Sequence, residues 1–239
     1  MFGTLWDIFF VMKEFAEGDL EHLQVKSGSY ELSITADVAL FGFLDGTLKV
    51  LLTKRSVGQL KDCWLLPGGV METDETAEEC ASKVLWHLTG IRDVHIEQVQ
   101  TYTSLNRHPL KRVATIAFYA LIKPEGHPVE RKMNVTEIKW FPLNELPKNT
   151  GFDHETIIQD AHKLLKRNLK GQLIFGELLP EYFTLNELQA LYESILEVHF
   201  DRRNFRKKIL QLDVIESTGQ VKKGVKGGPL LYRRTKLPN

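Results

Sequence analysis

The sequence predicts an α+β protein in which a mixed α/β domain is followed by a small helical domain with a β-hairpin. Strand and helix patterns alternate up to about residue 150, and two helix patterns with two short strands follow residue 180. Charge is also unevenly distributed, because Asp201–Asn239 contains eleven Lys/Arg and three Asp/Glu, whereas the preceding residues contain 20 and 28. The neutral total therefore combines an acidic body with a basic tail, which favours a polyanionic partner for the tail.

The N-terminal lead-in, residues 1–30, is predicted to lie outside the folded domains. Its apolar segment Leu5–Met12 is too short to span a bilayer and follows no basic residue, so we do not expect a signal peptide. The segment is either a short packed helix or translated upstream sequence with the true start at Met12. Cys63 and Cys80 fit no zinc or disulfide pattern, and no apolar run is long enough for a membrane span. We therefore expect a cytoplasmic protein with no membrane partner.

Residues 31–150 are predicted to form the α/β domain. The turn Asp45-Gly46 joins the first two strands, because both residues tolerate positive φ. A helix over residues 76–89 ends where Gly90 provides the C-cap. The predicted strands are residues 33–43, 48–54, 94–102, 113–122 and 138–141.

A linker helix is predicted over residues 151–172. Asp153 is placed to cap this helix and Gly171 to end it. We expect the helix to couple a ligand-binding site in the first domain to the second domain. Its apolar face consists of Ile157, Ala161, Leu164 and Leu165.

The tail has the element order of a helix-turn-helix domain with a hairpin. Thr184 and Glu187 form a capping box that opens a helix ending near Leu196. A second helix runs from Asp201 to Leu212, and short strands at 214–216 and 230–233 flank a loop rich in Gly and Lys. This order is typical of a winged helix-turn-helix, so residues 173–239 are predicted to be a DNA-binding domain.

The second helix of the tail is apolar on one face and cationic on the other. Phe205, Ile209 and Leu212 are expected to pack inward. Arg, Lys and Asn on the outer face suit base edges in the major groove, and lysines in the loop suit phosphates. The alternative is a solvated charged face on a structural helix. The residues predicted to contact DNA are Arg202, Arg203, Asn204, Arg206, Lys207, Lys208, Lys222, Lys223 and Lys226.

The segment Gly69–Ile91 resembles the Nudix signature G-x5-E-x7-R-E-U-x-E-E-x-G-U, where U is aliphatic. Leu66-Pro67-Gly68 leads into it, as in Nudix proteins. The resemblance covers roughly residues 30–150 and implies a Nudix α/β/α sandwich for residues 31–150. The matching residues are Gly69, Glu75, Leu85, Gly90 and Ile91.

The Nudix helix lacks the carboxylates that hydrolysis needs. An active enzyme holds Mg²⁺ with acids on one helix face, at positions that Val84, His87 and Leu88 occupy in this chain. Glu75 alone is a poor site for a divalent cation, and imidazole suits Mg²⁺ badly. We therefore expect no catalytic residue, no metal site and no cofactor. The alternative is an active hydrolase, acting on ADP-ribose or another nucleoside diphosphate, with a nucleic-acid-binding tail.

Loss of the acids leaves a pocket that can still bind a ligand. A polar loop precedes the strand at residue 113, and loops on a rigid scaffold commonly carry binding residues. An ordinary solvated loop is the alternative. The candidate ligand-binding residues are Lys54, Arg55, Asn106, Arg107, His108 and Arg112.

The two halves together resemble the Nudix-type bacterial transcription regulators. The segments Tyr182–Leu185 and Asp201–Lys208, the pair Leu231-Tyr232 and the triplet Phe152-Asp153-His154 carry this resemblance. The family includes regulators that respond to ADP-ribose and others that respond to a pentose such as arabinose. The resemblance implies a homodimeric repressor that binds palindromic double-stranded operator DNA and a small effector. Because the pyrophosphatase signature is degraded, we expect a sugar in preference to ADP-ribose.

Overall fold

The computed structural model describes residues 32–55, 60–169 and 175–235. The predicted lead-in, both interpretations of Leu5–Met12 and the predicted helix end at Gly171 lie outside the described residues. Within the described ranges, no helix combines the length and apolar character that crossing a membrane requires.

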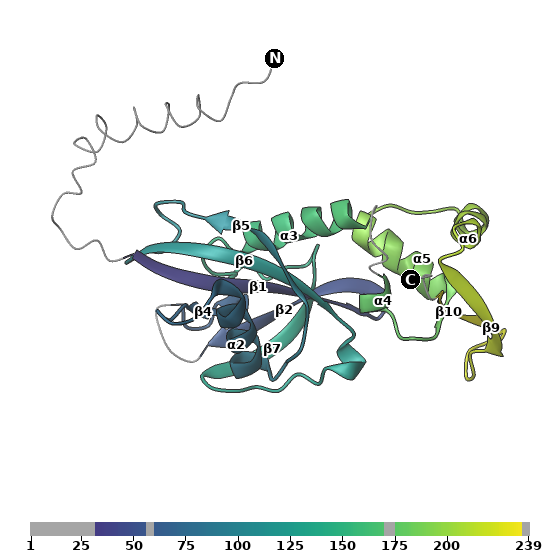
Figure 1. The fold of residues 1–239 in the computed structure, drawn as a ribbon, viewed down its shortest axis with the longest axis horizontal. Helices are drawn as coiled ribbons and strands as arrows, with labels where there is room; N and C mark the ends of the chain where they lie inside the picture. Colours follow the sequence, from purple (N-terminus) through teal and green to yellow (C-terminus); the bar gives the residue numbers. More distant parts are fainter. Residues whose placement is uncertain (1–31, 56–59, 170–174, 236–239) are drawn as a thin grey trace, which may run out of the picture. The chain divides into compact units, whose positions relative to one another are not determined.

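A mixed seven-stranded sheet is the framework of the first part of the described chain (Figure 1). The long central strand β1 is parallel to β6 and antiparallel to β2 and β4. β3 and β7 both pair with β2, and β5 pairs with β6 at the opposite edge. The strands are β1 (Leu32–Leu44), β2 (Thr47–Arg55), β3 (Trp64–Leu65), β4 (Gly68–Val70), β5 (Ile96–Tyr102), β6 (Arg112–Ile122) and β7 (Val135–Pro142).

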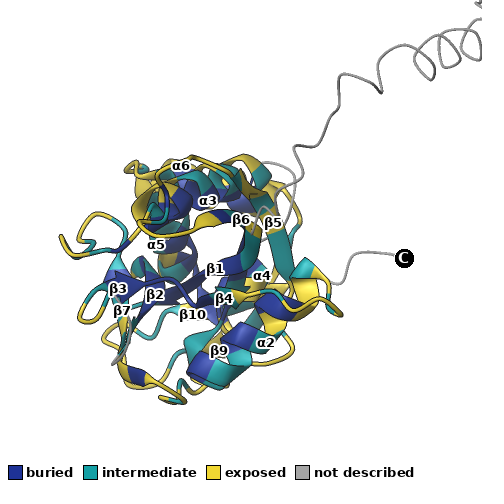
Figure 2. Cartoon of the chain, turned by 90° about the vertical axis from the view of Figure 1, so that its left-hand side faces the viewer, coloured by how far each residue is buried: buried dark blue, intermediate teal, exposed yellow. Residues whose placement is uncertain are grey.

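Side chains of β1 alternate between two apolar clusters, one on each face of the sheet. Val38 and Leu40 belong to the cluster that includes α2, whereas Phe41 and Phe43 belong to the cluster that includes α3. Figure 2 shows the buried strands β1 and β2 between these two helices. The α/β/α sandwich that the Nudix resemblance implied is therefore confirmed. The helices are α2 (Ala77–Thr89) and α3 (His154–Asn168).

Turns and caps follow the local sequence signals. Asp45 and Gly46 have φ values of 52° and 76°, as the predicted hairpin between β1 and β2 requires. Thr76 caps α2, and Gly90 ends it at a φ of 79° by donating its N–H to the Trp86 carbonyl. A short 3-10 helix, η1 (Pro124–Gly126), follows β6.

The C-terminal part has the winged helix-turn-helix order that the sequence predicted. Thr184 caps α5 in a reciprocal capping box with Glu187, and Asp201 caps α6 by accepting the N–H of Asn204 at 2.9 Å. β8, β10 and β9 form a three-stranded antiparallel sheet in that order, with the β9–β10 hairpin as the wing. The elements are α4 (Phe175–Leu178), β8 (Phe183–Thr184), α5 (Leu185–Leu196), α6 (Arg202–Gln211), β9 (Ile215–Val221) and β10 (Leu230–Arg234).

Two predictions about the helices are wrong. Leu212 is 64% exposed, because α6 ends at Gln211 and the C-cap residue leaves the apolar face that Phe205 and Ile209 occupy. Asp153 stands at the N-cap of α3, but its side chain makes no capping hydrogen bond. Its carboxylate binds the guanidinium of Arg107 instead.

The helix interpreted as a linker is a packed part of the core. Ile157, Ala161 and Leu165 of α3 are fully buried, and the helix contacts β1, β5, β6 and α5. One continuous apolar cluster runs from the sheet through these residues to Leu188 of α5 and Phe205 of α6. α3 therefore joins the two parts of the chain through a shared core.

Candidate ligand pocket and DNA-binding face

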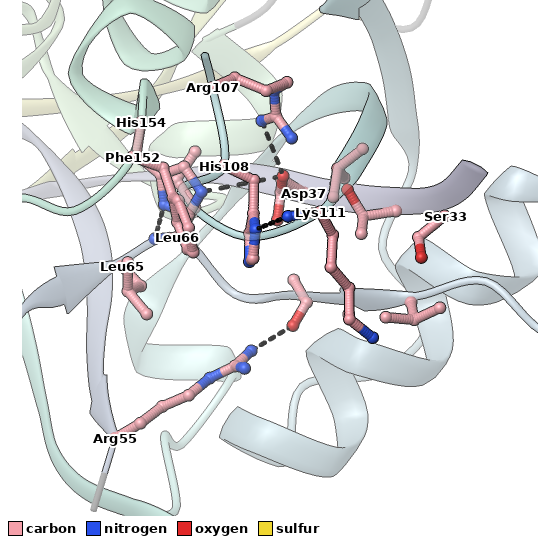
Figure 3. A pocket seen from close by; sticks show the side chains of 15 residues that line it. Ser33, Asp37, Arg55, Leu65, Leu66, Arg107, His108, Lys111, Phe152 and His154 are labelled. Carbon is pink, nitrogen blue, oxygen red and sulfur yellow. Dashed lines mark hydrogen bonds and ion pairs between the residues drawn. The ribbon is translucent and has the colours of Figure 1, made fainter. Parts of the chain in front are cut away.

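A cavity of about 290 Å³ opens beside β1, β4 and the loop before β6 (Figure 3). Its volume is at the lower end of the range for small-molecule sites. The lining combines apolar side chains with several cationic ones and one buried carboxylate. The lining residues are Ser33, Thr35, Asp37, Arg55, Leu65, Leu66, Gly68, Gly69, Val70, Arg107, His108, Lys111, Val113, Phe152 and His154.

Of the two predicted cations at the end of β2, only Arg55 lines the pocket. Neighbouring strand residues point to opposite faces, so Lys54 turns away to pair with Glu137 at 3.1 Å. The Arg55 guanidinium donates to the Gly68 carbonyl, and its Nε is buried without a hydrogen-bond partner. Burial lowers the pKa of Arg55, while the charge of Asp37 opposes that change. The pocket thus contains an unsatisfied cationic donor.

The predicted loop brings Arg107 and His108 to the pocket. Arg107 is buried, and its Nε and Nη2 donate to the two carboxylate oxygens of Asp153 at 3.0 and 2.8 Å. His108 stacks on Phe152 with 5.2 Å between the ring centroids. Lys111, from the same loop, also lines the pocket. The loop therefore supplies cationic and aromatic groups, as a charged ligand with a planar part requires.

Two candidates from the same region do not line the cavity. Asn106 is exposed, although the next two residues reach the pocket. Arg112 is also exposed, and its Nη1 donates to the carbonyls of Thr103 and Ser104 at 2.8 and 3.2 Å. Arg112 thus braces the loop, while its strand neighbour Val113 faces the cavity.

Sequence reasoning missed a buried polar group at the base of the pocket. The Nδ1 of His154 accepts the N–H of Leu66 at 2.9 Å, and its Nε2 lies 3.8 Å from the carboxylate of Asp37. Burial lowers the pKa of His154, although the charge of Asp37 opposes this effect. A Cβ at Gly68 would collide with Asp37, so the glycine makes room for the carboxylate. The sequence signal that could have revealed this group is Asp37, a lone aspartate inside an apolar strand.

The backbone next to this group is strained. Phe152 has a φ of 56°, which is rare for a bulky residue. Its ring lies against both His108 and His154, with centroid distances of 5.2 and 5.4 Å. Strain of this kind is concentrated at ligand sites, where surrounding contacts hold it in place.

The Nudix metal positions do not fit a magnesium site. Val84 and Leu88 are buried, and a Cβ at Gly69 would lie 2.7 Å from Val84 Cγ1. His87 lies beside Trp86 with 4.6 Å between ring centroids. Glu75 is paired with Lys83 at 2.6 Å. At Val84 and Leu88, apolar side chains stand where the Nudix signature has the oxygen donors that Mg²⁺ prefers. Among the described residues, no group of three His, Cys, Asp or Glu side chains is placed to hold a metal ion.

α3 extends from the pocket to the winged helix domain. Asp153 and His154 stand at its start, and two polar side chains about two and three turns further on contact the C-terminal end of α5. His162 Nε2 lies 2.8 Å from the Ile195 carbonyl, and Lys166 pairs with Glu197. Burial lowers the pKa of His162, so the neutral ring donates from Nε2 to this carbonyl at neutral pH.

The predicted DNA contacts on α6 share an exposed face. Phe205 and Ile209 pack inward, and the ring of Phe205 lies 5.8 Å from that of Tyr192. We call the polar residues of α6 together with the wing loop, residues 222–229, the DNA-binding face. The exposed predicted contacts on this face are Arg202, Arg203, Asn204, Arg206, Lys207, Lys208, Lys223 and Lys226. Lys222 differs, because it is half-buried and its ammonium pairs with Glu187.

Two family models cover most of the described chain. The model described as "NUDIX domain" matches residues 34–161, and the model described as "NrtR DNA-binding winged helix domain" matches residues 175–233. A curated relative, "ADPR responsive transcriptional repressor NtrR" of Acinetobacter baylyi, is 32% identical over 203 residues, which are 84% of this chain and 81% of that protein. The "ADP-ribose pyrophosphatase" of Methanocaldococcus jannaschii is 34% identical over 131 residues, covering 55% of this chain and 76% of that enzyme.

Solved structures of Shewanella oneidensis NrtR are similar to this chain. The structure complexed with a 27mer DNA is 30% identical with a TM-score of 0.70, covering 84% of this chain and 93% of that one. The structure of its NUDIX domain complexed with ADP ribose is 28% identical with a TM-score of 0.52, and the match covers 62% of this chain and 96% of that one. The domain order and the fold agree with these matches. The chain therefore belongs to the NrtR family of DNA-binding transcription regulators, which join a Nudix domain to a winged helix domain.

Proposed function

We propose that the chain is a homodimeric transcriptional repressor that senses ADP-ribose in its pocket and binds operator DNA with its winged helix domain. One observation supports an anionic ligand. The Nε of Arg55 is buried without a hydrogen-bond partner, at a pocket that Lys111 also lines. The diphosphate of ADP-ribose offers anionic acceptors to both side chains, whereas a pentose carries no charge. The comparisons also favour ADP-ribose, and the sequence-based preference for a sugar finds no support in them.

Substitution of Arg55 tests the ligand class. We expect Arg55→Met to weaken ADP-ribose binding by about 1.5–3 kcal/mol, roughly 10- to 150-fold in Kd, because it removes a charge-assisted hydrogen bond. Lys54→Met is the matched control and is expected to change Kd less than about two-fold, since Lys54 turns away from the pocket. Titration calorimetry with ADP-ribose and with arabinose measures the Kd of the wild-type protein and of each variant. Equal losses in the two variants, or tighter binding of arabinose, would contradict the proposal.

We further propose that the chain does not hydrolyse ADP-ribose efficiently. The proposal is supported by the buried Val84 and Leu88, which occupy two of the carboxylate positions on α2. Glu79, the nearest acid on the helix, is used in the capping box of Thr76. These residues leave no pair of carboxylates on the helix face that an active enzyme uses.

An assay for the AMP and ribose 5-phosphate formed from ADP-ribose in the presence of Mg²⁺ tests this expectation. We expect turnover far below the rate of roughly 1–1000 per second that enzymes ordinarily reach. The pyrophosphatase of Methanocaldococcus jannaschii provides the positive control. Turnover within the ordinary range would establish the alternative, an active hydrolase with a nucleic-acid-binding tail.

The exposed cations of α6 are proposed to read base edges, and those of the wing loop to bind phosphates. The proposal is supported by Phe205 and Ile209, whose burial turns Arg203 and Lys207 outward. A duplex selected from a random pool by the wild-type protein provides the probe.

Arg203→Ala and Lys226→Ala are expected to have different effects on binding to this duplex. Arg203→Ala should reduce discrimination against substituted base pairs by about 1–3 kcal/mol. Lys226→Ala should weaken all sequences alike and reduce the slope of log K against log salt by about 0.9. Anisotropy titrations measure the base discrimination and the salt slope. Lys148→Ala, at an exposed site of the Nudix domain, is the control. Wild-type-like binding by both variants would rule out this face.

α3 is proposed to couple the pocket to the DNA-binding domain. The helix begins at the pocket with Asp153 and His154, and His162 holds the last turn of α5. A ligand that binds one arrangement of these contacts better than another shifts the protein toward that arrangement and so changes its affinity for DNA. DNA then changes the affinity for the ligand by the same factor.

Removal of the hydrogen bond between α3 and α5 tests this coupling. ADP-ribose is expected to change the wild-type DNA affinity by about five-fold or more, and His162→Leu should bring that ratio closer to one. Gln159→Leu, an exposed change on the same helix, serves as the control. DNA binding with and without ADP-ribose is measured for each protein, and an unchanged ratio in His162→Leu would disprove the coupling route.

A further inference from the structure

The first turn of α5 holds one cation from each half of the DNA-binding face. Arg206 of α6 donates from Nη2 to Asn186 Oδ1 at 3.0 Å. Lys222, at the start of the wing loop, pairs with Glu187, the next residue of the same turn. One helical turn therefore connects the recognition helix α6 to the wing.

Glu187 is used by both of its carboxylate oxygens. Oε2 accepts the N–H of Thr184 at 2.8 Å and its hydroxyl at 2.9 Å, while Oε1 receives the ammonium of Lys222. Burial raises the pKa of Glu187, but the hydrogen bonds from Lys222 and Thr184 outweigh burial and hold the pKa below its ordinary value. The side chain is therefore an anion with fixed geometry at neutral pH.

Lys222 lies at the base of the wing, unlike the other two loop lysines. It directly follows Val221, the last residue of β9, and its N–H donates to the Pro229 carbonyl at 2.9 Å, which closes the loop. Its side chain is 40% exposed and turned to Glu187, whereas Lys223 and Lys226 are exposed beyond it. The geometry of Lys222 thus fits an anchor of the loop.

An anion beside a DNA-binding face ordinarily weakens binding, because it repels the phosphate backbone. Removal of such a carboxylate is then expected to strengthen binding. Glu187 also closes the capping box of α5, so its presence alone does not show a role in DNA binding. The sign of its effect on DNA affinity therefore separates a positioning role from simple electrostatics.

We propose that Glu187 is a positioning residue for DNA binding, which fixes the base of the wing through Lys222 so that Lys223 and Lys226 meet phosphates in register with α6. Lys222 acts through this pair and does not itself neutralise a phosphate. The inference rests on the DNA-binding face proposed above.

Glu187→Gln tests the sign of the effect on the selected duplex. Glutamine can retain the capping box with Thr184 but loses the charge that holds Lys222. We expect affinity to fall roughly five-fold, as loss of a well-ordered, partly buried pair predicts. Glu181→Gln, the same charge change at an exposed site of this domain, is expected to leave affinity unchanged or to raise it up to about two-fold.

Substitutions of Lys222 decide the question if Glu187→Gln is unstable to thermal melting. Lys222→Met should cause a similar loss of DNA affinity, because binding must then order the wing. The slope of log K against log salt should not change, because the variant neutralises the same phosphates as the wild-type protein. Lys222→Arg should retain wild-type affinity. The double variant Glu187→Gln/Lys222→Met should lose no more than either single variant.

Three results would overturn the proposal. They are tighter binding by Glu187→Gln, additive losses in the double variant, and a salt slope reduced by about 0.9 in Lys222→Met, which would make Lys222 a phosphate contact. Failure of the DNA-binding face itself is distinguishable, because the wild-type protein would then select no duplex, or Lys223→Ala would leave the affinity for the selected duplex unchanged.

Discussion

Burial of α3 between the sheet and α5 is the constraint on which the two halves of this protein depend. Ile157, Ala161 and Leu165 have no exposed surface, and their cluster continues into α5 and α6. A helix packed on both sides cannot shift without disturbing a close-packed core. A displacement at one end of the helix is therefore passed on to the polar contacts at the other end. This packing places the ligand pocket and the DNA-binding domain on one rigid element.

Buried charge at the start of α3 specifies the shape of the pocket. Arg107 lies between Asp153 and Asp37, with Nη2 distances of 2.8 and 3.9 Å. Charges removed from water need partners, and an ion pair broken in such a place costs about 3–5 kcal/mol. The loop that carries Arg107 is consequently held against α3. Arg55 differs, because its buried Nε has no hydrogen-bond partner among the described residues.

Much of the fold could be predicted from local sequence signals. The turn at Asp45-Gly46, the C-cap at Gly90 and the capping box of Thr184 are each fixed by a few adjacent residues, and each forms as expected. The candidate site was harder to predict. The loop carrying Arg107 was identified. Asp37 and His154 are separated by more than a hundred residues, and only the packing of α3 against the sheet brings them together.

Residue identities alone establish the order of elements, the replacement of the Nudix carboxylates by Val84, His87 and Leu88, and the cationic face of α6. These features depend on residue identity and on helical or strand periodicity, which are local properties. The tertiary structure decided the partners of the charged side chains. Asp153 binds Arg107 instead of capping its helix, Lys54 and Arg55 separate, and Lys222 turns to Glu187. Long-range packing determines these partners. A charged group that is removed from water needs an opposite charge, and it pairs with the one that the fold places within reach.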